Sequence, residues 1–238
     1  MKIVVLTGAG ISAESGISTF RDNNGLWEQH RIEDVATPEA FQRNPKLVHT
    51  FYNARREQLD NQAIAPNAAH LALVELEKVL GDDFLLITQN VDDLHQRAGS
   101  KNLLAMHGSL RESLCSYCKH TGLVKSPLST DTVCPACTKK GGMRPNIVWF
   151  NEMPYYLEEI YAALARCDIF ISIGTSGNVY PAAGFVAIAN EAKAHTIELN
   201  LEPSNQNSNF AEHHQGPATK LVPQWVEAFM RDRMQLKH

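Results

Sequence analysis

Four of the five cysteines have the spacing of metal ligands. Cys115 and Cys118 form one C-x2-C pair, and Cys134 and Cys137 form a second pair after fifteen intervening residues. Two such pairs can place four thiolates at the corners of a tetrahedron, the geometry that Zn²⁺ prefers. Disulfides would need an oxidising compartment, and a redox C-x-x-C would need only one pair. The pattern predicts one structural zinc ion per chain, whereas Cys167 stands alone in an apolar stretch and is expected to be a buried thiol.

A glycine-rich turn follows the first apolar run. Residues 2–7 read KIVVLT and residues 8–13 read GAGISA, a G-x-G-x-x-A pattern. Such glycines allow a tight turn and a close approach of the backbone to a pyrophosphate. A dehydrogenase would next show a second strand that ends in an acidic residue, about 20 residues on. Residues 20–27 read FRDNNGLW instead, a polar loop with no strand before it. The turn therefore favours a dinucleotide such as NAD without the usual architecture of hydride transfer.

Three further apolar runs, at residues 84–88, 169–173 and 195–199, are each followed by polar or small residues. The carboxyl ends of parallel strands meet at one edge of a sheet, where ligands of open α/β folds gather. The alternative is a set of ordinary turns, because Asn and Asp serve turns often. The residues concerned are Gln89, Asn90 and Asp92, then Gly174, Thr175 and Ser176, and finally Asn200 and Glu202.

The elements that would position these residues alternate along the chain. Helical spacing of apolar residues predicts helices over 67–80, 157–167, 182–194 and 222–234, between the four apolar runs. Alternating strands and helices predict an α/β fold with a doubly wound, parallel, Rossmann-like sheet. We assign residues 1–28, 63–110 and 145–238 to this NAD-binding domain. A helical insertion at 29–62 and a zinc-binding module at 111–144 would form a smaller domain beside it.

Taken in order, these motifs resemble the signature of the sirtuins. GAGIS at 8–12, SGI at 15–17 and FR at 20–21 open it, and TQNVD at 88–92 and HG at 107–108 continue it. After the cysteines come RPNIVWF at 144–150, GTS at 174–176 and NLE at 200–202. The likeness is to the compact bacterial NAD-dependent protein deacylases. Ser18 and Asn151 depart from it, because proline and glycine are usual at those positions.

The resemblance implies roles for individual residues. His107 becomes the catalytic general base toward a ribose hydroxyl, although a lone histidine is more often structural and the chain has ten. Val148, Trp149 and Phe150 would bind the acyl-lysine peptide as an added strand, where the alternative is an ordinary half-buried strand. Contacts with NAD are implied for Gly8, Ala9, Gly10, Ser12, Ala13, Phe20, Arg21, Trp27, Gln89, Asn90, Val91, Asp92, Gly174, Thr175, Ser176, Asn200, Leu201, Glu202 and Ala218.

Tyr52 and Arg55 bear on the substrate. They are three residues apart in a segment that reads as helical, so they are neighbours on one helix face. In the family, Tyr and Arg at this spacing mark the branch that removes acidic acyl groups, and a guanidinium can bind a carboxylate through two hydrogen bonds. The alternative is a solvated arginine beside an aromatic ring. We expect succinyl-lysine and malonyl-lysine as substrates, and acetyl-lysine as well.

The implied activity is NAD-dependent deacylation of protein lysines, with NAD consumed as a co-substrate and nicotinamide and 2'-O-acyl-ADP-ribose as products. Two alternatives stay open: a protein ADP-ribosyltransferase on the same scaffold, and a non-catalytic NAD-sensing interaction module.

Composition restricts the partners. The 238 residues carry 22 Lys and Arg against 26 Asp and Glu, a formal net charge of -4. This balance gives no basic footprint for nucleic acid. No apolar run approaches the about 20 residues that span a bilayer. With no leader-like start, we expect a cytoplasmic, monomeric enzyme whose partners are acylated proteins.

Overall fold

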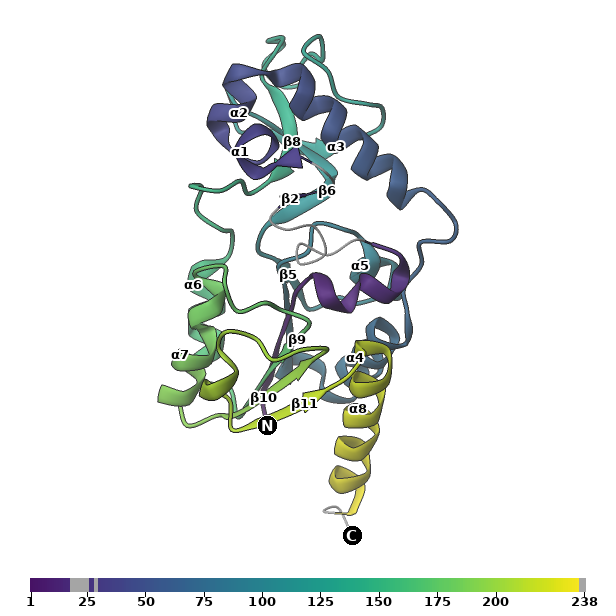
Figure 1. Cartoon of the computed structure of the whole chain (residues 1–238), viewed down its shortest axis with the longest axis vertical. Coiled ribbons are helices and arrows are strands. Elements are labelled where there is room, and N and C mark those ends of the chain that lie inside the picture. Colours follow the sequence, from purple (N-terminus) through teal and green to yellow (C-terminus); the bar gives the residue numbers. More distant parts are fainter. Residues whose placement is uncertain (18–25, 28–29, 236–238) are drawn as a thin grey trace.

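The computed structural model describes residues 1–17, 26–27 and 30–235. Figure 1 shows an elongated molecule, with a large sheet and its helices in the lower half and a smaller group of helices and strands above. The described elements of the large sheet are strands β1 (Ile3–Thr7), β4 (Phe84–Thr88), β5 (Leu103–Ala105), β9 (Ile169–Ile173), β10 (His195–Asn200) and β11 (Glu212–Gln215).

All neighbouring strands of this sheet are parallel, in the order β11-β10-β9-β1-β4-β5. The chain leaves β1 toward β4 on one side and returns to β9 on the other. The strand order therefore reverses at β1, and a doubly wound sheet opens a crevice at the carboxyl ends of its strands at such a point.

Helices cover both faces of the large sheet. Successive residues of β1 point to opposite faces, so Ile3 and Val5 pack with α4 (Ala68–Leu80) and α8 (Ala218–Gln235). Val4 and Leu6 pack with α6 (Leu157–Leu164) and α7 (Phe185–Glu191). A short helix, α5 (Leu94–Ala98), follows β4. Both faces of the sheet are therefore buried, which explains why its strands read as continuous apolar runs.

The smaller unit combines segments that are far apart in the sequence. Helices α1 (Ile32–Val35), α2 (Pro38–Arg43) and α3 (Pro45–Leu59) share a core with strands β6 (Gly108–Cys115) and β8 (Met143–Ile147). Strand β7 (Thr121–Leu123) completes the antiparallel sheet β7-β6-β8, and β2 (Leu26–Trp27) pairs with β3 (His30–Arg31). Thr37 and Asn44 cap α2 and α3, and each is followed by a proline at the first helical position.

Short 3-10 helices make several of the connections: η1 (Ala9–Ile11), η2 (Ala13–Ser15), η3 (Gly81–Asp83), η4 (Ala182–Gly184) and η5 (Asn207–Asn209). The glycine-rich turn after β1 thus leads into two single 3-10 turns, η1 and η2.

The predicted α/β class and doubly wound sheet are confirmed, but several bounds were wrong. The helix predicted over 157–167 ends at Leu164, and that over 182–194 is η4 followed by α7. The last helix begins at Ala218, four residues early, and contains Pro223. The Val and aromatic residues of the segment at 146–152 predict one extended piece, but β8 ends at Ile147 and the chain then turns. The division into two domains stays a prediction.

Candidate active site and metal centre

A buried hydrogen-bonded group lies at the carboxyl ends of β1 and β4. Asn90 Nδ2 donates to Ser12 Oγ (3.2 Å), and Ser12 Oγ donates to Asp92 Oδ2 (3.1 Å). All three side chains are buried. Burial raises the pKa of Asp92, while the hydrogen bonds from the Leu94 amide and the Ser12 hydroxyl oppose that rise. The predicted nucleotide residues of two separate motifs therefore meet in one site.

The glycines of the first turn make room for the loop after β9. A Cβ on Gly8 would lie 2.7 Å from the carbonyl oxygen of Gly174, and one on Gly10 would lie 2.7 Å from the Gly174 Cα. Gly10 N–H donates to that same carbonyl (2.9 Å), and Gly174 has a φ of +62°. Backbone meets backbone here, so the glycines are required by the fold itself as well as by any approaching phosphate.

His107 lies between β5 and β6, with its ring next to the end of β4. Its Nδ1 is 3.0 Å from the carbonyl oxygen of Gln89. A carbonyl can only accept, so Nδ1 carries the ring proton and Nε2 keeps its lone pair. Burial lowers the pKa of His107, and the bond to Gln89 partly offsets this. The neutral imidazole is therefore the resting form, as a general base requires.

The loops after β9 and β10 add further predicted residues. Asn200 Nδ2 donates to the Thr175 carbonyl (2.6 Å), which joins the two loops. Leu201 and Glu202 are exposed at the rim, and the Ser176 carbonyl accepts from the backbone of residue 205. Ala218 begins α8, whose first turn is held to the glycine-rich turn because Glu14 accepts from Thr219 N–H and Oγ1 (3.0 and 2.7 Å).

Some predicted contacts cannot be placed. Phe20 and Arg21 lie outside the described residues, as does Ser18, and for Trp27 only the backbone in β2 is described.

An arginine clamp holds the predicted substrate segment. Arg144 NH1 and NH2 each lie 2.7 Å from a carboxylate oxygen of Glu152, and the guanidinium carbon lies 3.6 Å from the centroid of the Trp149 ring. Glu152 also accepts from Trp149 N–H (2.9 Å). Asn151, where the family usually has glycine, has a φ of 71°, a left-handed conformation that Asn tolerates. Sequence reasoning missed the Arg144–Glu152 pair, because the two residues are eight positions apart across a turn.

The segment around Trp149 connects His107 to α3. Val148 N–H donates to the carbonyl of His107 (2.9 Å), and Trp149 Nε1 donates to the hydroxyl of Tyr52 (3.0 Å). Tyr52 is buried, and burial raises the pKa of its phenol, so the hydroxyl stays protonated. Arg55 is half-buried one turn further along α3, with its guanidinium carbon 5.0 Å from the Phe51 ring centroid. Phe150 is exposed.

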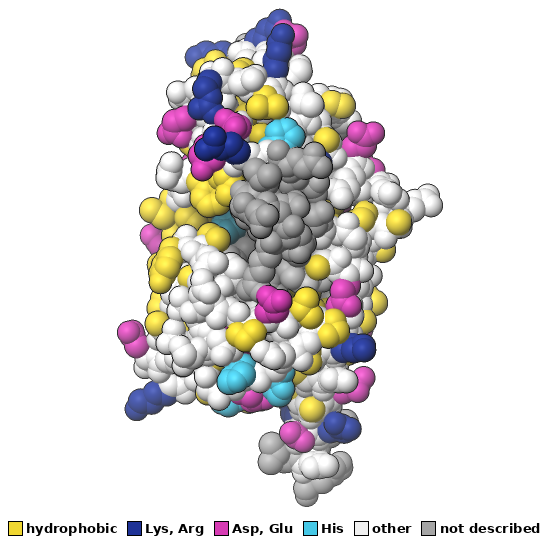
Figure 2. All heavy atoms as spheres, viewed as in Figure 1, with side chains coloured by type: hydrophobic (Ala, Val, Ile, Leu, Met, Phe, Trp, Pro, Cys, Tyr) yellow, Lys and Arg dark blue, Asp and Glu magenta, His cyan; other side chains and the backbone are white. Residues whose placement is uncertain are grey.

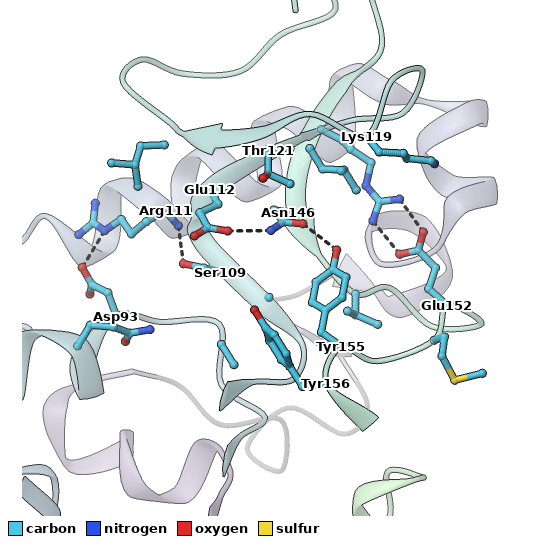
Figure 3. A pocket seen from close by; sticks show the side chains of 18 of the residues that line it. Asp93, Ser109, Arg111, Glu112, Lys119, Thr121, Asn146, Glu152, Tyr155 and Tyr156 are labelled. Atoms are coloured by element: carbon cyan, nitrogen blue, oxygen red, sulfur yellow. Dashed lines mark hydrogen bonds and ion pairs between the residues drawn. The ribbon is translucent and has the colours of Figure 1, made fainter. Parts of the chain in front are cut away.

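A groove of about 1100 Å³ begins beside this strand, with Gly108 and Val148 in its wall. Figure 3 shows that its polar side chains bond with one another. Tyr155 donates to Asn146 Oδ1 (2.8 Å), and Asn146 Nδ2 donates to Glu112 (2.8 Å). The wall of the groove next to β6 and β8 is therefore built from polar groups that already have partners.

The four predicted metal ligands converge. The Sγ atoms of Cys115, Cys118, Cys134 and Cys137 all lie within 4.8 Å of one another, and two pairs are separated by 3.8 and 3.7 Å. Zn–S bonds of about 2.3 Å in a tetrahedron place sulfur atoms about 3.8 Å apart. The donor set and spacing fit Zn²⁺ with a closed coordination sphere.

The two halves of the metal centre have the same backbone turn. Lys119 N–H donates to Cys115 O and Thr138 N–H donates to Cys134 O, both at 2.9 Å. Lys119 and Thr138 also both have positive φ, at 62° and 60°. Cys167, as predicted, is a buried thiol elsewhere.

Charged side chains of both signs share the face shown in Figure 2. On the face in Figure 2, acidic and basic side chains are interspersed and no large patch of one charge forms. Within the described residues, every helix is too short or too polar to span a bilayer.

The Sir2 family model matches residues 8–181. This chain belongs to the Sir2 family. A relative from Bdellovibrio bacteriovorus named NAD-dependent protein deacylase is 60% identical over 96% of this chain and 96% of its own length. A relative of the same name from Pasteurella multocida is 59% identical, with 97% and 98% covered.

Solved Sir2 structures are similar as well. A Sir2 homologue–NAD complex has a TM-score of 0.87 at 39% identity and covers 97% of this chain and 90% of its own. Sir2Af2 bound to a myristoylated histone peptide has a TM-score of 0.75 at 33% identity, with 98% and 93% covered. The resemblance, the fold and the enzyme class predicted from sequence are thus confirmed, while the roles of individual residues in this Sir2 protein stay predictions.

Proposed function

We propose that this Sir2 protein is an NAD-dependent protein-lysine deacylase that removes succinyl, malonyl and acetyl groups. The observation that carries the proposal is the state of His107. A half-buried, neutral imidazole with its proton on Nδ1 leaves the lone pair of Nε2 available as a base, next to the turn that carries Asn90 and Asp92.

Bound NAD would supply a ribose carbon whose bond to nicotinamide can break and a ribose hydroxyl that can take over the acyl group. His107 Nε2 would accept the proton of that hydroxyl, and the Gln89 carbonyl would stabilise the imidazolium that forms. Asn90 and Asp92 are held by Ser12, so they can bind ribose or amide groups without reorganising.

The proposed preference for acidic acyl groups rests on Tyr52 and Arg55 of α3. Tyr52 is oriented by the Trp149 indole, and Trp149 is adjacent to Val148, which bonds to His107. Tyr52 and Arg55 are three residues apart in α3, so their phenol and guanidinium groups lie on the same face of this helix. An acyl carboxylate could receive two charge-assisted hydrogen bonds from Arg55. Acetyl-lysine would fit the same space without making those bonds.

Product analysis tests the proposal. The purified protein is incubated with NAD and matched succinyl-, malonyl- and acetyl-lysine peptides, and products are separated by mass spectrometry. We expect free lysine peptide, nicotinamide and 2'-O-acyl-ADP-ribose in equal amounts. ADP-ribose attached to protein without loss of the acyl group would favour the transferase alternative. Absence of nicotinamide release would leave only a binding module.

A further inference from the structure

A chain of buried hydrogen bonds runs through the sheet behind the active site. His95 Nε2 lies 3.0 Å from Thr7 Oγ1, and Thr7 Oγ1 donates to Thr88 Oγ1 (2.9 Å). Thr88 Oγ1 also accepts from the backbone N–H of Asn90 (3.1 Å). His95, Thr7 and Thr88 are at most 1% exposed. The chain links α5, β1 and β4, and it ends at a residue of the predicted nucleotide site.

The same turn holds the catalytic histidine. Gln89 lies between Thr88 and Asn90, and its N–H donates to the Thr7 carbonyl (2.9 Å). Its carbonyl accepts from His107 Nδ1 (3.0 Å). The orientation of the Gln89 peptide therefore depends on the hydrogen bonds that fix Thr88 and Asn90 on either side of it. A rotation of that peptide would remove the group that sets the tautomer of His107.

The protonation of His95 defines which group donates in each of these hydrogen bonds. The Thr7 hydroxyl donates to Thr88 Oγ1 (2.9 Å), with the Ile87 carbonyl as a second, longer acceptor (3.5 Å). Both acceptors use the Thr7 proton, so Thr7 accepts from His95, and His95 carries its proton on Nε2. Burial and the neighbouring His70 ring, 4.8 Å away between centroids, lower the pKa of His95 to about 3. His95 is thus a permanent neutral donor, and without it the buried Thr7 hydroxyl would lose a partner.

Hydrogen bonds hold both ends of the segment between β4 and α5. Asp92 Oδ1 accepts from Leu94 N–H (3.0 Å) at the start of α5, and His95 follows and reaches back to Thr7. Residues 88–95 are thereby bonded at both ends to the carboxyl end of the sheet, and Ser12 holds Asp92 in the middle.

We propose that His95 is a positioning residue for deacylation, which acts through Thr7 and Thr88 to fix the turn that presents Asn90 and holds His107 in its Nδ1–H tautomer. This role rests on the proposed function of His107. It gives a reason for a histidine in the core that neither binds substrate nor reacts.

Steady-state kinetics on four variants test this role. His95→Leu removes the donor, His95→Gln keeps an amide N–H near the Nε2 position, and Thr88→Val removes the hydroxyl at the other end of the chain. Leu164→Ala is the control, because Leu164 is fully buried against the opposite face of the sheet and truncation lowers stability away from this chain. All four are assayed with their melting temperatures measured in parallel.

We expect kcat to fall about tenfold in His95→Leu and Thr88→Val, the change that corresponds to one buried hydrogen bond. The KM for the acyl peptide should stay within about twofold. His95→Gln should recover most of the lost kcat, and Leu164→Ala should keep the wild-type kcat despite a lower melting temperature. A His95→Leu protein with wild-type kcat, or a loss that His95→Gln does not repair, would overturn the proposal.

A measurement independent of turnover separates this proposal from the proposed function. Nitrogen-15 NMR of the His107 ring should show the Nδ1–H tautomer in the wild-type protein and a mixture of tautomers in Thr88→Val and His95→Leu. An unchanged His107 spectrum in both variants would refute the positioning role. Altered spectra in a protein with no deacylase activity would instead refute the proposed function alone.

Discussion

The proposed catalytic chemistry depends on one hydrogen bond at His107. The Gln89 carbonyl accepts a hydrogen bond from Nδ1–H, and burial lowers the pKa of the ring, so Nε2 keeps its lone pair at neutral pH.

Replacing His107 should remove turnover and leave binding. In His107→Ala we expect kcat to fall by at least about 100-fold, the usual contribution of an acid–base group. Affinity for NAD and for peptide, measured by calorimetry, should stay near the wild-type values. In the wild-type protein, the rising limb of kcat/KM with pH should lie below the ordinary histidine pKa of about 6.5, because the folded pKa is lowered. Wild-type turnover in a folded variant would remove His107 from the mechanism.

Arg55 and Tyr52 should decide between acyl groups. Arg55→Met keeps the length of the side chain but removes the cation. We expect kcat/KM on a succinyl peptide to weaken by about 2 to 5 kcal/mol, the range for truncating one partner of a buried charge pair, with a far smaller change on the acetyl peptide. Tyr52→Phe removes one neutral donor, so it should give a smaller loss of the same sign.

Arg56 offers a matched control on the same helix. Its guanidinium is buried and donates to the Leu110 carbonyl (2.8 Å) and to Asn53 Oδ1 (2.8 Å), so it holds α3 against β6. Arg56→Met should lower stability and affect both peptides equally. If Arg55→Met also costs the same on both peptides, the acidic-acyl assignment is wrong.

At the scale of elements, the zinc module is two copies of one turn joined by a small sheet. Each C-x2-C is followed by a residue with positive φ, and the backbone bonds of the two turns are equivalent. Cys115 lies at the end of β6, which begins at Gly108 next to His107. Loss of the metal should therefore disturb a strand that the active site shares.

We expect Cys134→Ala to lose its zinc and to melt at a markedly lower temperature, because the three remaining thiolates do not complete the four-coordinate sphere. Zinc content by mass spectrometry and melting by circular dichroism measure both effects. Cys167→Ala is the control, because that thiol is buried far from the cluster in sequence and packs against the large sheet. It should retain one zinc per chain. Full stability in a zinc-free Cys134→Ala protein would contradict a structural role.

The elements also show how far sequence reasoning reaches. Strands β4 and β9 were predicted to the residue, because strands buried on both faces are continuous apolar runs bounded by polar residues. Strand β11, with the sequence EHHQ, is entirely polar, so it leaves no such signal. The His95–Thr7–Thr88 chain and the Arg144 clamp connect residues through tertiary contacts, and no local pattern encodes them.

At the scale of the whole molecule, the site spans two cores. The large sheet supplies the Ser12–Asn90–Asp92 group, and the core shared by α3, β6 and β8 supplies Tyr52 and Trp149. His107 lies where the chain passes from β5 to β6 and therefore between the two. Stability of the large core thus bears directly on the geometry of the site.

Two histidines in the large core link its stability to pH. His70 and His95 are fully buried, and burial lowers their pKa values to about 4 and about 3. In the unfolded chain both would titrate at about 6.5. Between these values the unfolded state binds more protons than the folded state, so the free energy of unfolding rises with pH and falls as pH drops below about 6.5.

As pH falls through that window, each histidine should lower the free energy of unfolding by about 1.4 kcal/mol per pH unit. The pair together should lower it by roughly 2 to 3 kcal/mol per pH unit. Urea denaturation between pH 7.5 and 5, with zinc content monitored, measures this slope. The double variant His70→Gln, His95→Gln removes both titrating rings and keeps amide groups in their places, and all other histidines and the zinc site are common to the two proteins. The slope of the wild-type protein should therefore exceed that of the double variant between pH 6 and 5. Parallel curves for the two proteins would mean that the buried rings take up protons in the folded state as readily as in the unfolded chain.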